Sequence, residues 1–217
     1  MNILTLESKH WKDVEGVSRE EIASAVKHAA NEAKELLPSD LPYINIMIEP
    51  EIADHVIPET GDMGMTYDDS HIYITFDFTV PYGKDSLLKH LRSTTYHELT
   101  HAVTFEHTPW QPGVLYGAIT EGLATVFERN YANSAPLWGK YESDEIMHAW
   151  LKELKDLPET EIKDKNYFVE HTDGRKWIVY KTGVWIIDKL MGSGEDLFNL
   201  MGQSPTELLD QFSRLSK

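Results

Sequence analysis

Two hydrophobic periods follow one another along the chain. Between residues 43 and 78, apolar and polar side chains alternate, as in β-strands that bury one face. In one earlier segment, and again from residue 85 onward, apolar side chains recur every three to four residues, as in amphipathic helices. The pattern predicts an α+β fold, with a small mixed or antiparallel sheet in the N-terminal half and a mostly helical C-terminal half.

The earlier helical segment runs from Ser18 to about Leu37. Ser18 and Glu21 have the spacing of a capping box, in which each side chain binds the backbone N–H of the other residue. Pro38 follows the last apolar position and marks the end of the helix. The apolar stripe of this helix consists of Ile22, Val26, Ala29, Ala30 and Ala33.

The alternating region predicts three strands. The first, residues 43–49, is bracketed by Pro42 and Pro50. The other two, Met63–Tyr67 and His71–Phe78, are close enough to form a hairpin. Since the first hairpin strand contains glycine and few apolar side chains, we expect it at the edge of the sheet.

The C-terminal pattern predicts a series of helices. Asp85 is the candidate N-cap of the first, which carries the sequence HELTH and lies at the junction of the two halves. We expect further helices at about 115–129, 143–154 and 176–191, and two short ones that end near Leu215. The whole chain, 1–217, is expected to form one domain, with an α/β lobe of about 1–106 and a helical lobe of about 107–217.

Composition narrows the classes of partner. The net charge of −16 disfavours nucleic acids and anionic membranes, which carry the same sign. No apolar run approaches the roughly 20 residues that cross a bilayer, and the N-terminal stretch lacks the features of a signal peptide. The chain has no cysteine, which excludes disulfides and thiolate metal sites. We therefore expect a cytoplasmic protein, monomeric by default.

The stretch HELTH contains two histidines four residues apart, His97 and His101, with Glu98 between them. Residues at this spacing share one face of a helix, so two imidazoles can bind one metal ion. Glu98 can reach a water molecule on that ion and act as a general base. Because the pattern is short, the alternative is a helix that contains two histidines by chance.

Two residues compete for the role of third ligand. His107 has the spacing of the last histidine in the metzincin pattern H-E-x-x-H-x-x-G-x-x-H. That pattern needs a glycine midway, because the chain leaves the helix there at positive φ. Here the residue is Thr104, which is strained at positive φ. His107 is then a polar residue at the helix C-terminus, where the helix dipole favours a protonated imidazole.

Glu121 is the better candidate. Nineteen residues separate it from His101, and they include a helix end, a proline-containing loop and the start of the next helix. This path can return an antiparallel helix beside the first. Gly122 follows in the phrase TEGLA and would allow two helices to approach closely. The alternative is an ordinary surface glutamate, although its neighbours Ile119, Leu123 and Ala124 are apolar.

A HExxH motif followed at this distance by a glutamate resembles the gluzincins, the thermolysin-like clan of zinc metallopeptidases. The phrase EGLA is similar to one found in a bacterial family of predicted zinc-dependent proteases. The chain resembles this family over about Met63 to Gly183. The resemblance implies a single Zn²⁺ and a peptide or protein substrate. It also implies that His97, His101 and Glu121 are the metal ligands and Glu98 the catalytic base.

The sequence departs from the thermolysin pattern at one position. Thermolysin-like enzymes have an aspartate four residues after the ligand glutamate, which orients a histidine ligand. Thr125 occupies this position here, so another group must orient the imidazole.

Two further roles rest partly on the resemblance. Tyr180 interrupts a strongly apolar helix and is the candidate donor to the negative charge of the tetrahedral intermediate, with His171 as the alternative. The main chain of Gly64, Met65 and Thr66 would bind an extended substrate along the sheet edge.

Two other classes of function stay open. One is a zinc-binding module of the same fold with little or no hydrolytic activity, acting in binding or regulation. The other is a helical interaction domain without a metal. Since no motif for gripping a free amino terminus is present, an endopeptidase or oligopeptidase is favoured within the peptidase class.

Overall fold

The computed structural model describes residues 1–37, 43–52, 56–81, 83–108, 113–157 and 165–215. The chain divides into two compact units. The first consists of Met1–Val103 with Tyr131–Ser134, and the second of Thr104–Asn130 with Ala135–Lys217.

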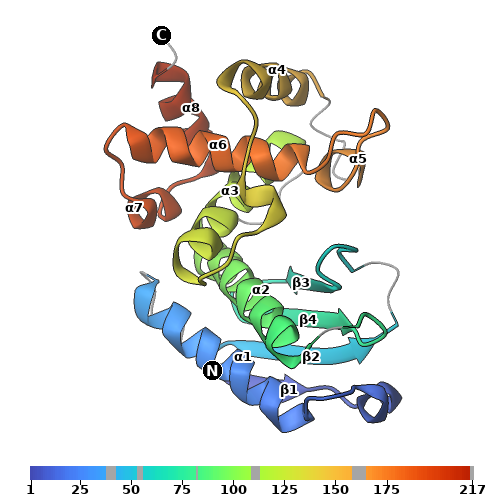
Figure 1. Cartoon of the computed structure of the whole chain (residues 1–217). Coiled ribbons are helices and arrows are strands. Elements are labelled where there is room, and N and C mark those ends of the chain that lie inside the picture. Colours follow the sequence, from blue (N-terminus) through green and yellow to red (C-terminus); the bar gives the residue numbers. More distant parts are fainter. Residues whose placement is uncertain (38–42, 53–55, 82, 109–112, 158–164, 216–217) are drawn as a thin grey trace. The chain divides into compact units, whose positions relative to one another are not determined.

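The first unit is built on a mixed sheet of four strands in the order β1-β2-β4-β3. Strands β1, β2 and β4 run parallel, and β3 is antiparallel to β4 at the edge. Helices α1 and α2 lie in front of this sheet in Figure 1. The elements are β1 (Asn2–Thr5), η1 (Lys9–Asp13), α1 (Arg19–Leu36), β2 (Asn45–Glu51), β3 (Asp62–Thr66), β4 (His71–Asp77) and α2 (Lys84–Thr104).

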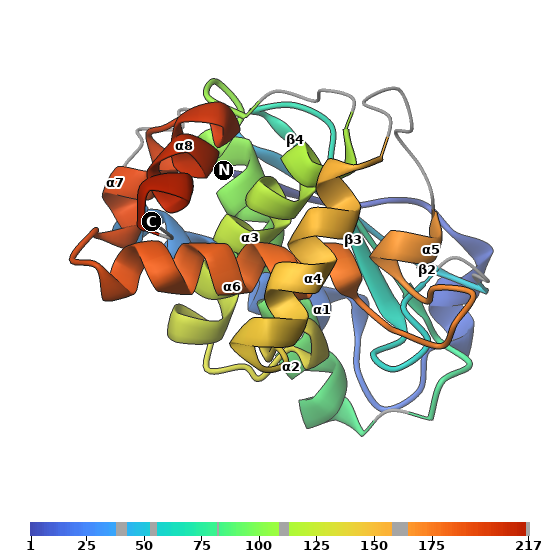
Figure 2. The ribbon, with the colours of Figure 1, turned by 90° about the horizontal axis from the view of Figure 1, so that it is seen from above.

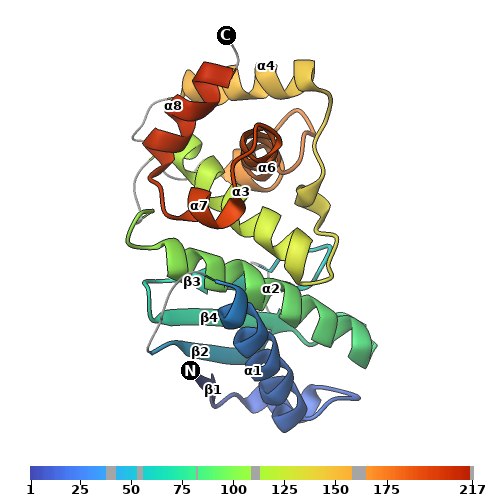
Figure 3. The same cartoon turned by 90° about the vertical axis from the view of Figure 1, so that its left-hand side faces the viewer.

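Helix α1 confirms the sequence prediction in detail. The Ser18 hydroxyl accepts a hydrogen bond from the Glu21 backbone N–H at 3.1 Å, and the Glu21 carboxylate accepts one from the Ser18 N–H at 2.8 Å. All five residues of the predicted apolar stripe are buried. The helix is seen beside the strands in Figure 3.

The inner face of the sheet follows the alternation of the sequence. Every second residue of β2 and β4 is buried, and these residues supply much of the core of the first unit: Ile46, Ile48, Pro50, Ile72, Ile74 and Phe76. The predicted hairpin of β3 and β4 is confirmed, with Met63 opposite Thr75. Asp68 stabilises its turn, because its carboxylate accepts hydrogen bonds from the Ser70 N–H and hydroxyl, each at 2.8 Å.

Strand β2, predicted at residues 43–49, is not bracketed by prolines as the sequence suggested. β2 begins at Asn45, and Pro50 lies inside it in register with Phe76 of β4. The backbone nitrogen of Pro50 points toward the side of β2 on which β1 lies. The pairing of β1 with β2 ends at Thr5 and Ile48, two residues before Pro50. The missing N–H therefore removes no bond between β1 and β2. Pro42 lies outside the described residues.

Two other boundaries differ from the sequence prediction. Strand β1, Asn2–Thr5, was not predicted, because four residues, two exposed and two half-exposed, carry too little pattern to reveal a strand. Helix α2 begins at Lys84, so Asp85 lies in its first turn rather than at the N-cap. An acidic side chain is favoured there by the helix dipole.

The second unit is helical and is organised around α6, which contacts η2, α4, α5 and α8 (Figure 2). Helices α3, α4, α6 and α8 confirm the predicted positions to within about two residues. None of the helices in the described residues is long and apolar enough to cross a membrane. The elements are α3 (Val114–Tyr131), η2 (Leu137–Gly139), α4 (Asp144–Lys155), α5 (Lys165–Phe168), α6 (Ile178–Gly192), α7 (Leu197–Met201) and α8 (Pro205–Leu215).

Candidate metal centre

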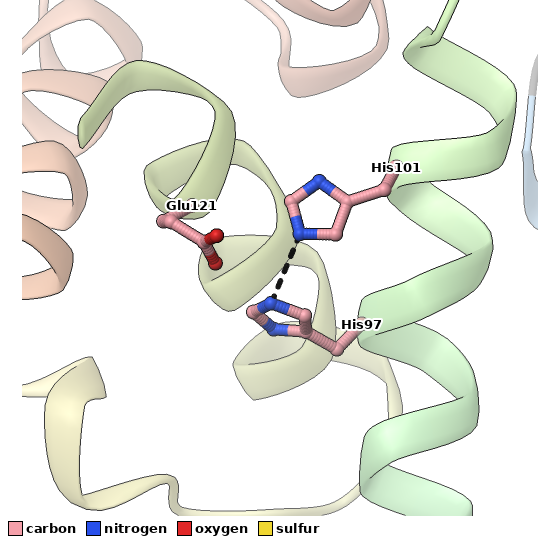
Figure 4. Close-up of side chains that lie close together, drawn as sticks. All are labelled: His97, His101 and Glu121. Atoms are coloured by element: carbon pink, nitrogen blue, oxygen red, sulfur yellow. Dashed lines mark hydrogen bonds between the residues drawn. The ribbon is translucent and has the colours of Figure 1, made fainter. Parts of the chain in front are cut away.

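Helix α2 places the two motif histidines one turn apart and directs their rings at one another. The Nε2 atoms of His97 and His101 are 3.2 Å apart, and the ring planes are inclined by 75°. His97 is buried, whereas His101 is half-buried. Figure 4 shows both imidazoles on the same side of the helix.

Glu98 occupies the inner face of the same helix, against the edge strand. Its side chain is buried, with 5% of the residue exposed. The hydroxyl of Thr66 lies 2.7 Å from Glu98 Oε2 and 2.9 Å from the Glu98 backbone oxygen. A buried carboxylate is costly unless it accepts hydrogen bonds, and β3 supplies this donor.

Glu121 lies on α3 and is half-buried, between the half-buried Thr120 and the buried Gly122. One nitrogen from each of His97 and His101 and one carboxylate oxygen of Glu121 all lie within 4.8 Å of one another (Figure 4). Among the described residues, no other group of three or more histidine, aspartate or glutamate side chains places its ligand atoms this close together.

The donor set fits a zinc ion. Zn²⁺ binds imidazole nitrogen and carboxylate oxygen at about 2.0–2.2 Å, and tetrahedral coordination then separates neighbouring ligand atoms by about 3.4 Å. The 3.2 Å between the two Nε2 atoms is close to that edge length. If these three groups bound the ion, a fourth position would be open for water, as in catalytic rather than structural zinc sites.

His107 does not belong to this group. Helix α2 ends at Thr104, and the backbone N–H groups of His107 and Thr108 bind the Thr104 oxygen at 2.9 and 2.7 Å. Thr104 is not among the described residues that have positive φ. The chain therefore makes an ordinary helical end and lacks the sharp exit that the metzincin pattern requires.

Gly122 was expected to allow a close approach to the helix that carries HELTH, and this expectation is corrected, because the atoms nearest to Gly122 belong to Gly183 of α6. A Cβ atom on Gly122 would lie 2.5 Å from the carbonyl carbon of Gly183, and one on Gly183 would lie 1.8 Å from the Ala118 oxygen. The backbones of α3 and α6 are thus in direct contact. This crossing fixes Glu121, beside Gly122, relative to Tyr180, which precedes Gly183 by about one turn of α6.

Tyr180 lies in an aromatic cluster of the second unit. Its ring centroid is 5.7 Å from that of Trp138, 5.8 Å from that of Trp177 and 6.2 Å from that of Phe168. The side chain is half-buried. These contacts hold the ring in place, and its role as a donor stays a prediction.

The alternative donor, His171, belongs to a polar network. Its Nδ1 atom lies 2.9 Å from a carboxylate oxygen of Asp173. Arg175 binds both oxygens of Glu153 at 2.7 and 2.9 Å, and this pairing lowers the pKa of that carboxyl. The network is a structural explanation for His171 that needs no catalytic role.

Sequence reasoning assigned only main-chain roles to Gly64 and Thr66. Both lie on the inward face of β3, beside Glu98, together with Asp62, whose carboxylate accepts a hydrogen bond from the Thr94 hydroxyl. One signal was present, since polar residues alternate at 62 and 66 on a strand whose inner face should be apolar. Met65 lies between them, half-exposed.

Comparison with known proteins gives one match. The model of a family described as "Predicted Zn-dependent protease (DUF2268)" matches residues 22–210. These residues include every candidate ligand and catalytic residue named above. Searches among curated proteins and among solved structures found no match.

Proposed function

Because the chain belongs to the family of predicted Zn-dependent proteases, we propose that it is a zinc metallopeptidase of the gluzincin type. The observation that carries the proposal is the group of His97, His101 and Glu121, with ligand atoms within 4.8 Å of one another. Glu98, adjacent to the first histidine, is the proposed base. The substrate is a peptide or protein, cleaved as an endopeptidase or oligopeptidase would.

The proposed roles follow from the chemistry of each group. Zinc would lower the pKa of a bound water toward about 7 and polarise the substrate carbonyl. Glu98 takes a proton from the attacking water and delivers it to the leaving amine. Tyr180 donates a hydrogen bond to the negative charge that develops on the carbonyl oxygen. The main chain of β3 holds the substrate as an added strand.

The surroundings of Glu98 favour an enzyme over a zinc-binding module. A structural zinc site needs ligands and has no use for a second, buried carboxylate beside them. Here Glu98 is 5% exposed and accepts a hydrogen bond from Thr66. A buried charge of this kind is retained at a cost in stability, which a catalytic role explains.

Metal analysis of protein purified without added zinc is the first test. We expect close to one zinc ion per chain, and its loss in the double variant His97→Ala, His101→Ala. A protein that holds no zinc and binds none on titration would contradict both the enzyme and the zinc-binding module. It would leave the helical interaction domain.

Glu98→Gln separates the enzyme from the module. We expect this variant to keep its zinc and to lose cleavage of a peptide library by a factor of about 100 to 10,000, the usual contribution of a general base. Glu106→Gln is the matched control, because it makes the same change at an exposed position just beyond the same helix. Equal cleavage by Glu98→Gln and the natural protein would refute the mechanism.

A further inference from the structure

We propose that Thr66 and Gly64 of β3 position the carboxylate of Glu98, so that the edge strand sets the orientation of the general base. The catalytic meaning of this inference rests on the proposed function. Its physical content does not, because every contact involved lies within the first unit. Thr66 and Gly64 are positioning residues, which act on the reaction through Glu98.

The Thr66 hydroxyl is the first half of the arrangement. It lies 2.7 Å from Glu98 Oε2 and 2.9 Å from the Glu98 backbone oxygen, and Thr66 is 2% exposed. A hydroxyl has one hydrogen to donate, and a carboxylate is the stronger acceptor of the two. The contact of Oε2 with the Thr66 hydroxyl therefore holds the Glu98 carboxylate against β3.

The absence of a side chain at Gly64 is the second half. A Cβ atom there would lie 2.4 Å from both Cγ and Oε1 of Glu98 and 2.5 Å from Cδ. Gly64 does not have the positive φ that would itself call for glycine. Space for the Glu98 side chain is therefore the reason for glycine at this position.

The register of strand and helix holds both halves in place. Residues 62, 64 and 66 share the inward face of β3, as the strand period of two requires. Positions 94 and 98 share one face of α2, as the helical spacing of four requires. Asp62 accepts a hydrogen bond from Thr94, and Thr66 donates one to Glu98, so the strand is joined to the helix at two points.

This arrangement couples substrate binding to the base. The main chain of β3 is the proposed substrate-binding edge, and the inward side of the same residues contacts Glu98. A shift of β3 would move the substrate and the carboxylate together. The distance between the scissile carbonyl and the base is thereby kept constant.

Substitution at Thr66 tests the hydroxyl. Thr66→Val keeps the shape and removes the donor, and Thr66→Ser keeps the donor. We expect Thr66→Val to lower kcat by about 10- to 100-fold, in keeping with the loss of a hydrogen bond to a buried charge. We expect zinc content and KM to be unchanged and Thr66→Ser to recover most of kcat. Equal kcat for the valine and serine variants would overturn the proposal.

A double-mutant cycle on the metal-free protein gives a readout without activity. We expect Thr66→Val to lower Tm more in the natural protein than in a Glu98→Ala background, where the carboxylate that accepts the bond is absent. Thr66→Ala, a second variant without the donor, is carried through the same cycle in case the valine variant does not fold. Equal losses of Tm in both backgrounds would overturn the inference.

The two measurements separate the failure of this inference from the failure of the proposed function. Coupling between Thr66 and Glu98 in a protein that cleaves no peptide would leave the contact intact and remove its catalytic meaning. An active enzyme without coupling would keep the proposed function and remove the positioning role.

Substitution at Gly64 tests whether the absence of a side chain there makes room for Glu98. Gly64→Ala is expected to lower kcat at unchanged zinc content, because its Cβ atom displaces the Glu98 carboxylate. Gly192→Ala is the matched control, since a Cβ atom at that position meets nothing within 4 Å and the backbone does not have positive φ. Equal kcat for the two alanine variants would contradict the spatial argument.

Discussion

At the scale of the residue, the site combines groups that are costly to hold together. His97 is 7% exposed and Glu98 5% exposed, and these two polar side chains lie next to each other on a helix that is largely buried. The cost of desolvating them is offset only where each finds a partner. The Glu98 carboxylate accepts a hydrogen bond from Thr66, and a shared metal ion is the proposed partner of the two imidazole nitrogens, which lie 3.2 Å apart.

The third ligand can be tested by a pair of substitutions. We expect Glu121→Ala to weaken zinc binding by more than about 100-fold, because loss of a direct ligand should exceed the 10- to 100-fold cost of losing an outer hydrogen-bond partner. His107→Ala should leave zinc affinity within about twofold. Competition against a chromophoric chelator at pH 7.5 measures both. A larger loss for His107→Ala would favour the metzincin-like arrangement.

Local periodicity decides what could be predicted at this scale. The pairing of His97 with His101 depends only on the helical repeat, so the sequence was sufficient. The choice of Glu121 needed the path of the chain through a loop, and the resemblance supplied part of it. The contact of Thr66 with Glu98 joins a strand to a helix across 32 residues, and no local pattern encodes that register.

At the scale of the element, the crossing of α3 and α6 leaves no room for a side chain at either of its glycines. Neither Gly122 nor Gly183 can carry a side chain without moving a backbone. Small residues allow helix backbones to approach in this way, and close-packed interiors resist added atoms. The crossing therefore restricts what evolution or design can place beside Glu121.

Gly183→Ala should destabilise the fold strongly. Its Cβ atom would lie 1.8 Å from the Ala118 oxygen, so the two helices must separate. Overpacking of this kind costs about 1–3 kcal/mol or more. Urea denaturation measures the change in the free energy of unfolding, with Gly192→Ala as control, and a loss no greater than in the control would contradict the contact.

The pair of Arg175 and Glu153 predicts a dependence of stability on pH. Arg175 lowers the pKa of Glu153 in the folded protein, so the pair stabilises the fold above the unfolded pKa of about 4.3. The contribution is lost as pH falls through the lower, folded value. We expect Arg175→Gln to lower Tm at pH 7, and the part of the difference that depends on Glu153 to be lost below about pH 4. The part that depends on Asp173 should persist to lower pH, because Arg175 also binds its carboxylate and holds its pKa well below the usual range.

Arg214→Gln is the control for this prediction. Arg214 is exposed and its Nε binds the Asp210 backbone oxygen of the same helix, so its loss should change Tm little at either pH. A difference between Arg175→Gln and the natural protein that is constant from pH 7 to pH 3 would show that the pair does not titrate with the fold.

Elements differ in how well the sequence revealed them. Helices such as α1 and α4 carry several apolar repeats and a capping residue, and their bounds could be predicted closely. Strand β1 has four residues, and its partner β2 begins some forty residues later, at Asn45. Pro50 belongs to a strand because of where β1 ends, which depends on tertiary pairing rather than on the residues around the proline.

At the scale of the whole molecule, the α+β class followed from the change of hydrophobic period near residue 80, and the structure confirms it. The description of the chain as a single catalytic domain stays a prediction. The chain carries a net charge of −16, and polar side chains such as those of His97 and Glu98 are buried in it.

The short return at Tyr131–Ser134 has a consequence for dissection of the protein. Three peptide bonds join the two units, at 103–104, 130–131 and 134–135, because each unit consists of two separate segments of the chain. A fragment ending at Val103 would lack Ala132, whose backbone oxygen accepts a hydrogen bond from Arg92 at 3.0 Å. It would also lack Asn133, which turns the chain in the left-handed conformation. Expression of the first unit alone therefore requires that Tyr131–Ser134 be linked to it or supplied with it, rather than a simple truncation at Val103.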